Sequence, residues 1–231
     1  MKKIPFAFRL LLISNITFLA FTAIAMLYFP GGTILDHYTK GYSFFNNFFS
    51  ELGRWRTHLG ETKWISFWCF EIALIFQSIA MFIFNIYFLK HTKSIQLNPI
   101  AHFTALGSGV LFPIMLTGIA LTPCDLVLPM HMNFVYAGFG LLVPLSLSYT
   151  ILIRQHDILP NKYGNVMLII VFCISSYLLL MLFGPSPKNV PYVQQTAQKI
   201  IVYSMVFSLL YLTKGCIKYL SSSKKLNISI N

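Results

Sequence analysis

Charged side chains are scarce in this sequence of 231 residues. Asp, Glu, Lys and Arg make up 10% of the chain, whereas a soluble domain has about 25%. Hydrophobic residues make up 56% of it. Such a composition excludes an ordinary soluble domain and favours a protein whose surface faces lipid.

Acidic residues are scarcer still, with six Asp and Glu against 17 Lys and Arg and a net charge of +11. This basicity does not indicate a nucleic-acid partner, because eleven of the 17 basic residues fall on one side of the alternating loops. Such a bias orients membrane proteins with the basic loops in the cytoplasm, and contact with anionic lipid heads accounts for it. The eleven are Lys2, Lys3, Arg9, Lys90, Lys93, Arg154, Lys162, Lys214, Lys218, Lys224 and Lys225.

The common catalytic signatures are missing. The chain has no H-E-x-x-H, H-x-x-x-H, G-x-S-x-G, P-loop or Rossmann glycine pattern. Its four cysteines form no C-x-x-C pair, and His37, His58 and His131 lie far apart in the sequence. Zinc sites usually draw on closely spaced ligands, so zinc is disfavoured, though not ruled out, and we predict no cofactor.

Six apolar runs are long enough to cross a hydrocarbon core, which needs about 20 residues per helix. We therefore predict an all-α membrane protein, a six-transmembrane-helix bundle with both termini cytoplasmic, in the plasma (inner) membrane of a bacterium. Residues 1–220 form its single domain, and residues 221–231 form a polar, basic cytoplasmic tail. The predicted spans are 9–29, 65–89, 100–121, 132–153, 165–184 and 199–220.

A cleaved signal peptide is the alternative for the first run. Ala23-Ile24-Ala25 resembles a cleavage site, but the apolar stretch 10–29 is longer than the 7–15 residues typical of a signal peptide. We therefore expect it to remain as a membrane span.

Some polar and small residues lie inside the predicted spans. Ala105 and Gly109 form a small-xxx-small pair that lets helices pack closely, and Gln77 and Asn85 are expected to bond between helices. Glu71 lies about seven residues into its span, where a carboxylate is costly unless it is paired or faces water. We expect it to pair with Lys63 or Lys199, to line a cavity, or to lie nearer the surface than the span suggests.

Other polar residues gather at the predicted outer ends of different spans. Ser50, Glu51, Asp125 and His131 are candidate catalytic residues, in which Asp125 orients the His131 imidazole and Ser50 is the reacting hydroxyl. Helix capping and local ion pairs, for example between Glu51 and Arg54, explain the same residues equally well. The remaining candidates for this polar site are Arg54, Glu71, Gln195 and Gln198.

Two stretches carry a family resemblance. Phe49-Ser50-Glu51-Leu52-Gly53-Arg54 after the first span, and Thr122-Pro123-Cys124-Asp125 with His131 after the third, resemble the bacterial and archaeal membrane family catalogued as domain of unknown function 998. That family implies six spans and a Ser-Asp-Leu-Gly type motif, where this chain has Glu51. A more distant likeness is to DRAM-type membrane proteins. Neither resemblance implies a reaction.

Three functions follow as hypotheses. The first is a non-catalytic membrane protein that binds a lipid or a protein partner at the outer polar site. The second is a membrane-embedded lipid hydrolase or transferase, and the third is a small-molecule permease with a polar path through Glu71. The sequence leaves open whether the protein is an enzyme, and it does not indicate an oligomeric state.

Overall fold

Long helices make up most of the computed structural model, which describes residues 4–155 and 158–219. Six helices in these ranges are long and apolar enough to cross a membrane, which confirms the prediction of an all-α protein with six such helices. The predicted tail 221–231 lies outside the described residues. The six are α1 (Phe6–Leu27), α2 (Trp64–His91), α4 (Pro99–Leu121), α5 (Leu128–Gln155), α6 (Asn161–Phe183) and α7 (Val193–Tyr219).

Two short helices complete the described part of the chain, α3 (Ser94–Leu97) and the 3-10 helix η1 (Phe49–Gly53), and no strand is found there. The main departure from the predicted boundaries is α7, which begins at Val193 rather than at residue 199. Its first turns are polar, so hydropathy placed them outside the span. They are helical, and their side chains bond to the segment that contains η1.

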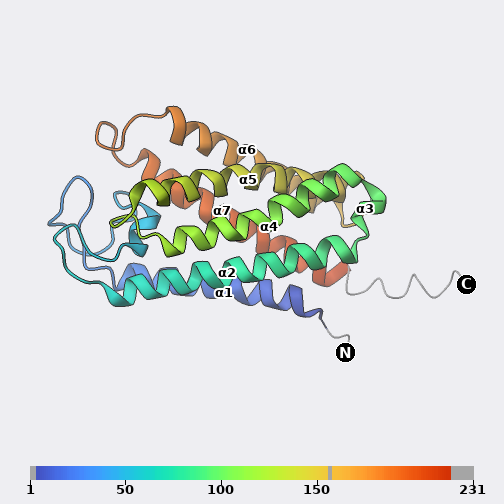
Figure 1. The fold of residues 1–231 in the computed structure, drawn as a ribbon, viewed down its shortest axis with the longest axis horizontal. Helices are drawn as coiled ribbons and strands as arrows, with labels where there is room; N and C mark the ends of the chain where they lie inside the picture. Colours follow the sequence, from blue (N-terminus) through green and yellow to red (C-terminus); the bar gives the residue numbers. More distant parts are fainter. Residues whose placement is uncertain (1–3, 156–157, 220–231) are drawn as a thin grey trace, which may run out of the picture.

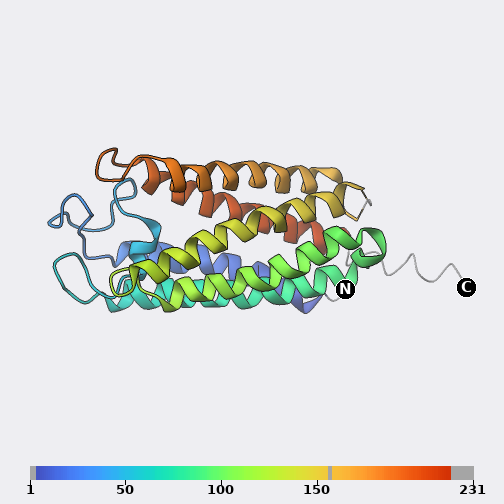
Figure 2. The same cartoon turned by 45° about the horizontal axis from the view of Figure 1, so that its top comes forward.

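The long helices form a closed ring. Each packs against the next in the order α1, α2, α4, α5, α6 and α7, and α7 returns to α1. Neighbours are antiparallel, so α1 begins and α7 ends at the same end of the bundle (Figures 1 and 2). We call the opposite end, which carries residues 28–63, the loop end.

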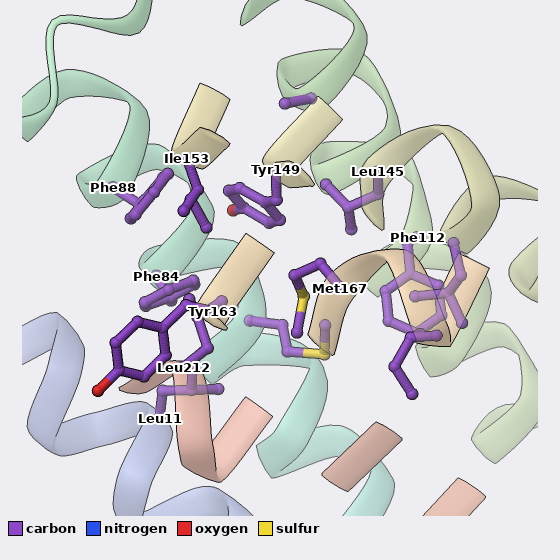
Figure 3. Close-up of a cluster of buried hydrophobic side chains, with 14 of the residues drawn as sticks. Leu11, Phe84, Phe88, Phe112, Leu145, Tyr149, Ile153, Tyr163, Met167 and Leu212 are labelled. Carbon is purple, nitrogen blue, oxygen red and sulfur yellow. The ribbon is translucent and has the colours of Figure 1, made fainter. Parts of the chain in front are cut away.

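The interior of the ring is apolar and aromatic. Figure 3 shows Phe84, Phe88, Tyr149 and Met167 from α2, α5 and α6 meeting in one cluster. A second cluster, nearer the loop end, includes Phe18, Phe49 and Phe70. Large apolar side chains also point outward, as expected where lipid rather than water surrounds the helices. Examples are Ile16, Ile79, Ile169, Phe172 and Ile200.

One polar cluster ties three helices together inside the bundle. Asn85 on α2 donates from Nδ2 to the Ala105 carbonyl on α4 at 3.2 Å, and the Tyr149 hydroxyl on α5 donates to Asn85 Oδ1 at 2.7 Å. A Cβ atom at Gly109 would lie 2.3 Å from Asn85 Cγ. The small residues at 105 and 109 therefore serve close packing, and Asn85 makes its predicted interhelical bond. Gln77 makes a longer one, from Nε2 to Asn15 Oδ1 on α1 at 3.4 Å.

Candidate functional site

The segment around η1 is inserted into the loop end of the helix ring. Phe49 and Leu52 are 3% and 0% exposed. The Phe49 ring packs against Phe18 of α1, Phe70 of α2 and Tyr203 of α7. Aromatic burial on three sides therefore holds η1 between the helices, and we call η1 with the preceding residues 47 and 48 the plug.

Glu51 stabilises the plug from inside. Its Oε2 atom accepts hydrogen bonds from Asn47 Nδ2 and from the Phe48 N–H, each at 2.8 Å. Its Oε1 atom lies 2.7 Å from His58 Nε2. The expected pairing of Glu51 with Arg54 is not made. Because three donors already occupy this carboxylate, it shapes the loop and has little capacity left for a substrate.

Two buried lysines clamp the plug from the helices. Lys63, just before α2, donates from Nζ to the Leu52 carbonyl at 2.6 Å and lies 4.7 Å from the centre of the Phe29 ring. Lys199 of α7 donates to the Asn47 carbonyl and, at 3.0 Å, to the Gln195 carbonyl. Both ends of the plug are therefore fixed by lysine Nζ donors from outside the plug.

The pKa of Lys63 follows from its surroundings. Burial lowers it from 10.5 to about 7, and the nearby Arg54 lowers it further, against the opposing influence of Cys124 and Asp125. Sequence analysis treated Lys63 and Lys199 only as possible partners of Glu71. The available signal was their position, since both are basic residues on the side where such residues are few.

Asp125 holds the chain that follows the plug. Its Oδ1 accepts from the Trp55 N–H at 2.8 Å, and its Oδ2 accepts from the Arg56 N–H at 2.9 Å. Asp125 therefore connects the turn between α4 and α5 to the loop. Within the described residues it makes no hydrogen bond to His131, so the predicted Asp125–His131 pair does not form.

His131 instead contacts the C-terminal end of α4. Its Nδ1 atom lies 2.7 Å from the Thr122 carbonyl. A carbonyl can only accept, so Nδ1 carries the proton and a neutral ring leaves Nε2 as an acceptor. The side chain is 3% exposed, and Nε2 has no partner among the described residues.

Glu71 is buried beneath the plug at 4% exposure. A Cβ atom at Gly53 would lie 2.8 Å from Glu71 Oε1 and 2.7 Å from Phe70 Cδ1, so glycine permits this close approach. The expected ion pair with Lys63 or Lys199 is not among the ion pairs of the described residues. Glu71 Oε2 has no hydrogen-bond partner there.

Two glutamines of α7, Gln195 and Gln198, differ in role. Gln198 accepts the Phe49 N–H at Oε1, at 2.7 Å. This contact assigns the amide orientation and leaves both Nε2 hydrogens for other partners. Gln195 is 1% exposed and its Oε1 atom has no partner among the described residues.

A cavity of about 480 Å³ opens between the plug and helices α5, α6 and α7. We call it the loop-end cavity. Five of the eight residues singled out from the sequence line it, whereas Asp125, Glu71 and Gln195 do not. The five are Ser50, Glu51, Arg54, His131 and Gln198, and Tyr136, Tyr177 and Gln194 add further polar groups.

The hydrogen-bond donors that remain unused in this cavity belong to cationic or neutral side chains. Arg54 donates from Nε to the Arg56 carbonyl at 3.0 Å, and its other N–H groups have no partner within the described residues. Cys124 also lines the cavity, but burial raises the pKa of its thiol to about 12, so it is no thiolate nucleophile at neutral pH. The arrangement suits binding of an anionic group.

The histidines of the loop end have other contacts in the part of the chain that the structure describes. The His37 and His58 rings stack at 4.8 Å, and His58 bonds to Glu51. No group of three or more His, Cys, Asp or Glu residues in the described ranges is placed to hold a metal ion.

Comparisons with protein-family models, with curated proteins and with solved structures found no match.

Proposed function

We propose that the protein binds an anionic lipid head group in the loop-end cavity, at the outer face of a bacterial plasma (inner) membrane. The observation that carries this proposal is the unequal use of two charges in that cavity. Glu51 is engaged by Asn47, the Phe48 N–H and His58, whereas most donors of Arg54 are unused. The cavity therefore offers a cation without a competing free carboxylate.

Two further features support a lipid as the ligand. The cavity lies at the end of helices that are apolar enough to span a membrane. Next to it the aromatic run 42–49 exposes Phe44 and Phe45, at 41% and 59%, which suits the interfacial depth of a bilayer. The outer position of this end follows from the charge bias of the loops, with both termini cytoplasmic.

The test is calorimetric titration of the purified protein in phosphatidylcholine nanodiscs with dihexanoyl phosphatidylglycerol. Arg54→Gln removes the unpaired cation and should weaken binding about ten-fold or more, as expected for a hydrogen bond to a charged group. Arg56→Gln is the matched control, because Arg56 is exposed in the same loop and does not line the cavity. Equal affinities for the two variants would contradict the proposal.

A lipid hydrolase or transferase is the second candidate, favoured by one observation. Ser50 and His131 line the same cavity, and His131 Nε2 is an unused acceptor. Against it, Glu51 and Asp125 are engaged elsewhere. Release of products from the same phosphatidylglycerol probe, abolished by His131→Ala at unchanged protein abundance, would establish this function.

The permease hypothesis has less support. The cavity that follows the loop-end cavity along the bundle is lined mainly by apolar side chains, and Glu71 does not line it. A polar path through Glu71 would be needed for a small polar solute.

A further inference from the structure

A second cavity, of about 100 Å³, lies within the helix ring. We call it the axial cavity. Its wall is formed by α1, α2, α4, α5, α7 and η1, and it is mainly apolar. It shares Ser50, Val135 and Gln198 with the loop-end cavity. The two cavities therefore border the same residue of the plug, Ser50, from its two sides.

The axial cavity continues further into the bundle. A smaller cavity of about 30 Å³ shares Met81, Phe112 and Leu142 with it. Apolar cavities stay dry and accept hydrocarbon, and one of about 150 Å³ holds a benzene ring. On that scale the two inner cavities accommodate about five carbon atoms.

We propose that one hydrocarbon chain of the lipid bound in the loop-end cavity passes the plug and occupies the axial cavity. This inference rests on the lipid-binding function proposed above and adds how the ligand is selected. The polar head remains beside Arg54 and Gln198, while the first carbons of one chain replace empty space between the helices. The second chain is left to the surrounding bilayer.

Besides Ser50 and Gln198 next to the plug, the wall contains a polar side chain deeper in the bundle, Gln77, which allows the occupant to be tested. Gln77 lines the axial cavity and its Oε1 atom has no partner among the described residues. A polar solute or a water chain would use this acceptor, whereas a hydrocarbon chain would not. Gln77→Leu therefore separates the two kinds of occupant.

Gly138 offers a way to fill the cavity from its wall. A Cβ atom there would lie 3.6 Å from Met115 Cβ and 3.9 Å from Phe112 Cε2, which is ordinary contact. The Cβ atom of a leucine at this position is therefore accommodated, and we expect the rest of the side chain to extend into the cavity. Gly140→Leu is the matched control, since a Cβ atom at Gly140 meets nothing within 4 Å.

The experiment measures the affinity of methyl, butyl, hexyl and octyl phosphate for the protein in nanodiscs, with empty nanodiscs to subtract partitioning. Each added methylene should raise affinity about four-fold until about five carbons are buried, and then the gain should stop. Gly138→Leu should lose most of this gain but keep methyl phosphate affinity, which also reports that the variant is folded. Gly140→Leu and Gln77→Leu should bind butyl phosphate as the unmodified protein does.

The outcomes separate the two proposals. Arg54-dependent binding of methyl phosphate without any gain from longer chains would overturn the axial site and leave the head-group site standing. A ten-fold loss of butyl phosphate affinity in Gln77→Leu would identify a polar occupant and also overturn it. Absence of Arg54-dependent binding for every probe would remove the head-group function itself.

Discussion

Lys63 should make the stability of this protein depend on pH. Burial lowers its pKa from 10.5 to about 7 in the folded protein, while the unfolded chain keeps a pKa of about 10.4. Between these values the unfolded state binds more protons, so stability rises as pH rises. The destabilisation that comes from burying Lys63 is fully present below pH 7, and it decreases as the pH rises toward the pKa of Lys63 in the unfolded chain.

The magnitude follows from the two pKa values. Because the side chain is 3% exposed, solvent screening is small. Applying the linkage relation to one group with these pKa values gives a gain of about 2–3 kcal/mol between pH 6 and pH 9. For a chain of this size that corresponds to a rise in Tm of roughly 5–10 °C.

The assay is thermal unfolding in detergent at several pH values for the unmodified protein and for Lys63→Met. The variant keeps a flexible apolar side chain, and Ser66 Oγ still donates to the Leu52 carbonyl at 3.3 Å. Other titrating groups are common to both proteins and cancel in the difference. Lys40→Met, at an exposed position of the same loop, should behave as the unmodified protein does. Parallel Tm profiles for Lys63→Met and the unmodified protein would refute the reasoning.

Two substitutions test the packing and the loop attachment. Gly109→Ala should lower the free energy of unfolding by about 1–3 kcal/mol in thermal unfolding, because the new methyl group overlaps Asn85. Gly107→Ala, where a Cβ atom meets nothing within 4 Å, should not lower it, and equal losses in the two variants would contradict this account. Asp125→Ala should leave two loop N–H groups without their acceptor and cost about 1.5–3 kcal/mol. Hydrogen exchange should then quicken at residues 54–56, and unchanged exchange would show that this carboxylate does not hold the loop.

The candidate site was only partly predictable. Sequence position brought Ser50, Arg54, His131 and Gln198 to the same end of the bundle, and these residues do line one cavity. The catalytic roles proposed for Ser50 and His131 stay hypotheses. The resemblance to domain of unknown function 998 likewise stays a prediction from its motifs.

Partner choice was the part that sequence reasoning missed. A pairing of Glu51 with Arg54 was one of the explanations considered, but Glu51 bonds to His58 because η1 turns its side chain back toward Asn47. Asp125 was assigned to His131, but the loop after η1 presents two N–H groups to it. Such choices depend on loop geometry, which no local pattern in this sequence encodes.

The sequence by itself determined the six helices that are long and apolar enough to cross a membrane. In hydrocarbon every backbone N–H and C=O group must be paired within the protein, so an apolar run of sufficient length forms a helix whatever its neighbours are. Only the tertiary structure decided that Lys63 and Lys199 are buried clamps, that the plug separates two cavities, and that Arg54 is left with unused donors. These properties arise where segments far apart in the chain meet, and there a few ångströms decide which donor reaches which acceptor.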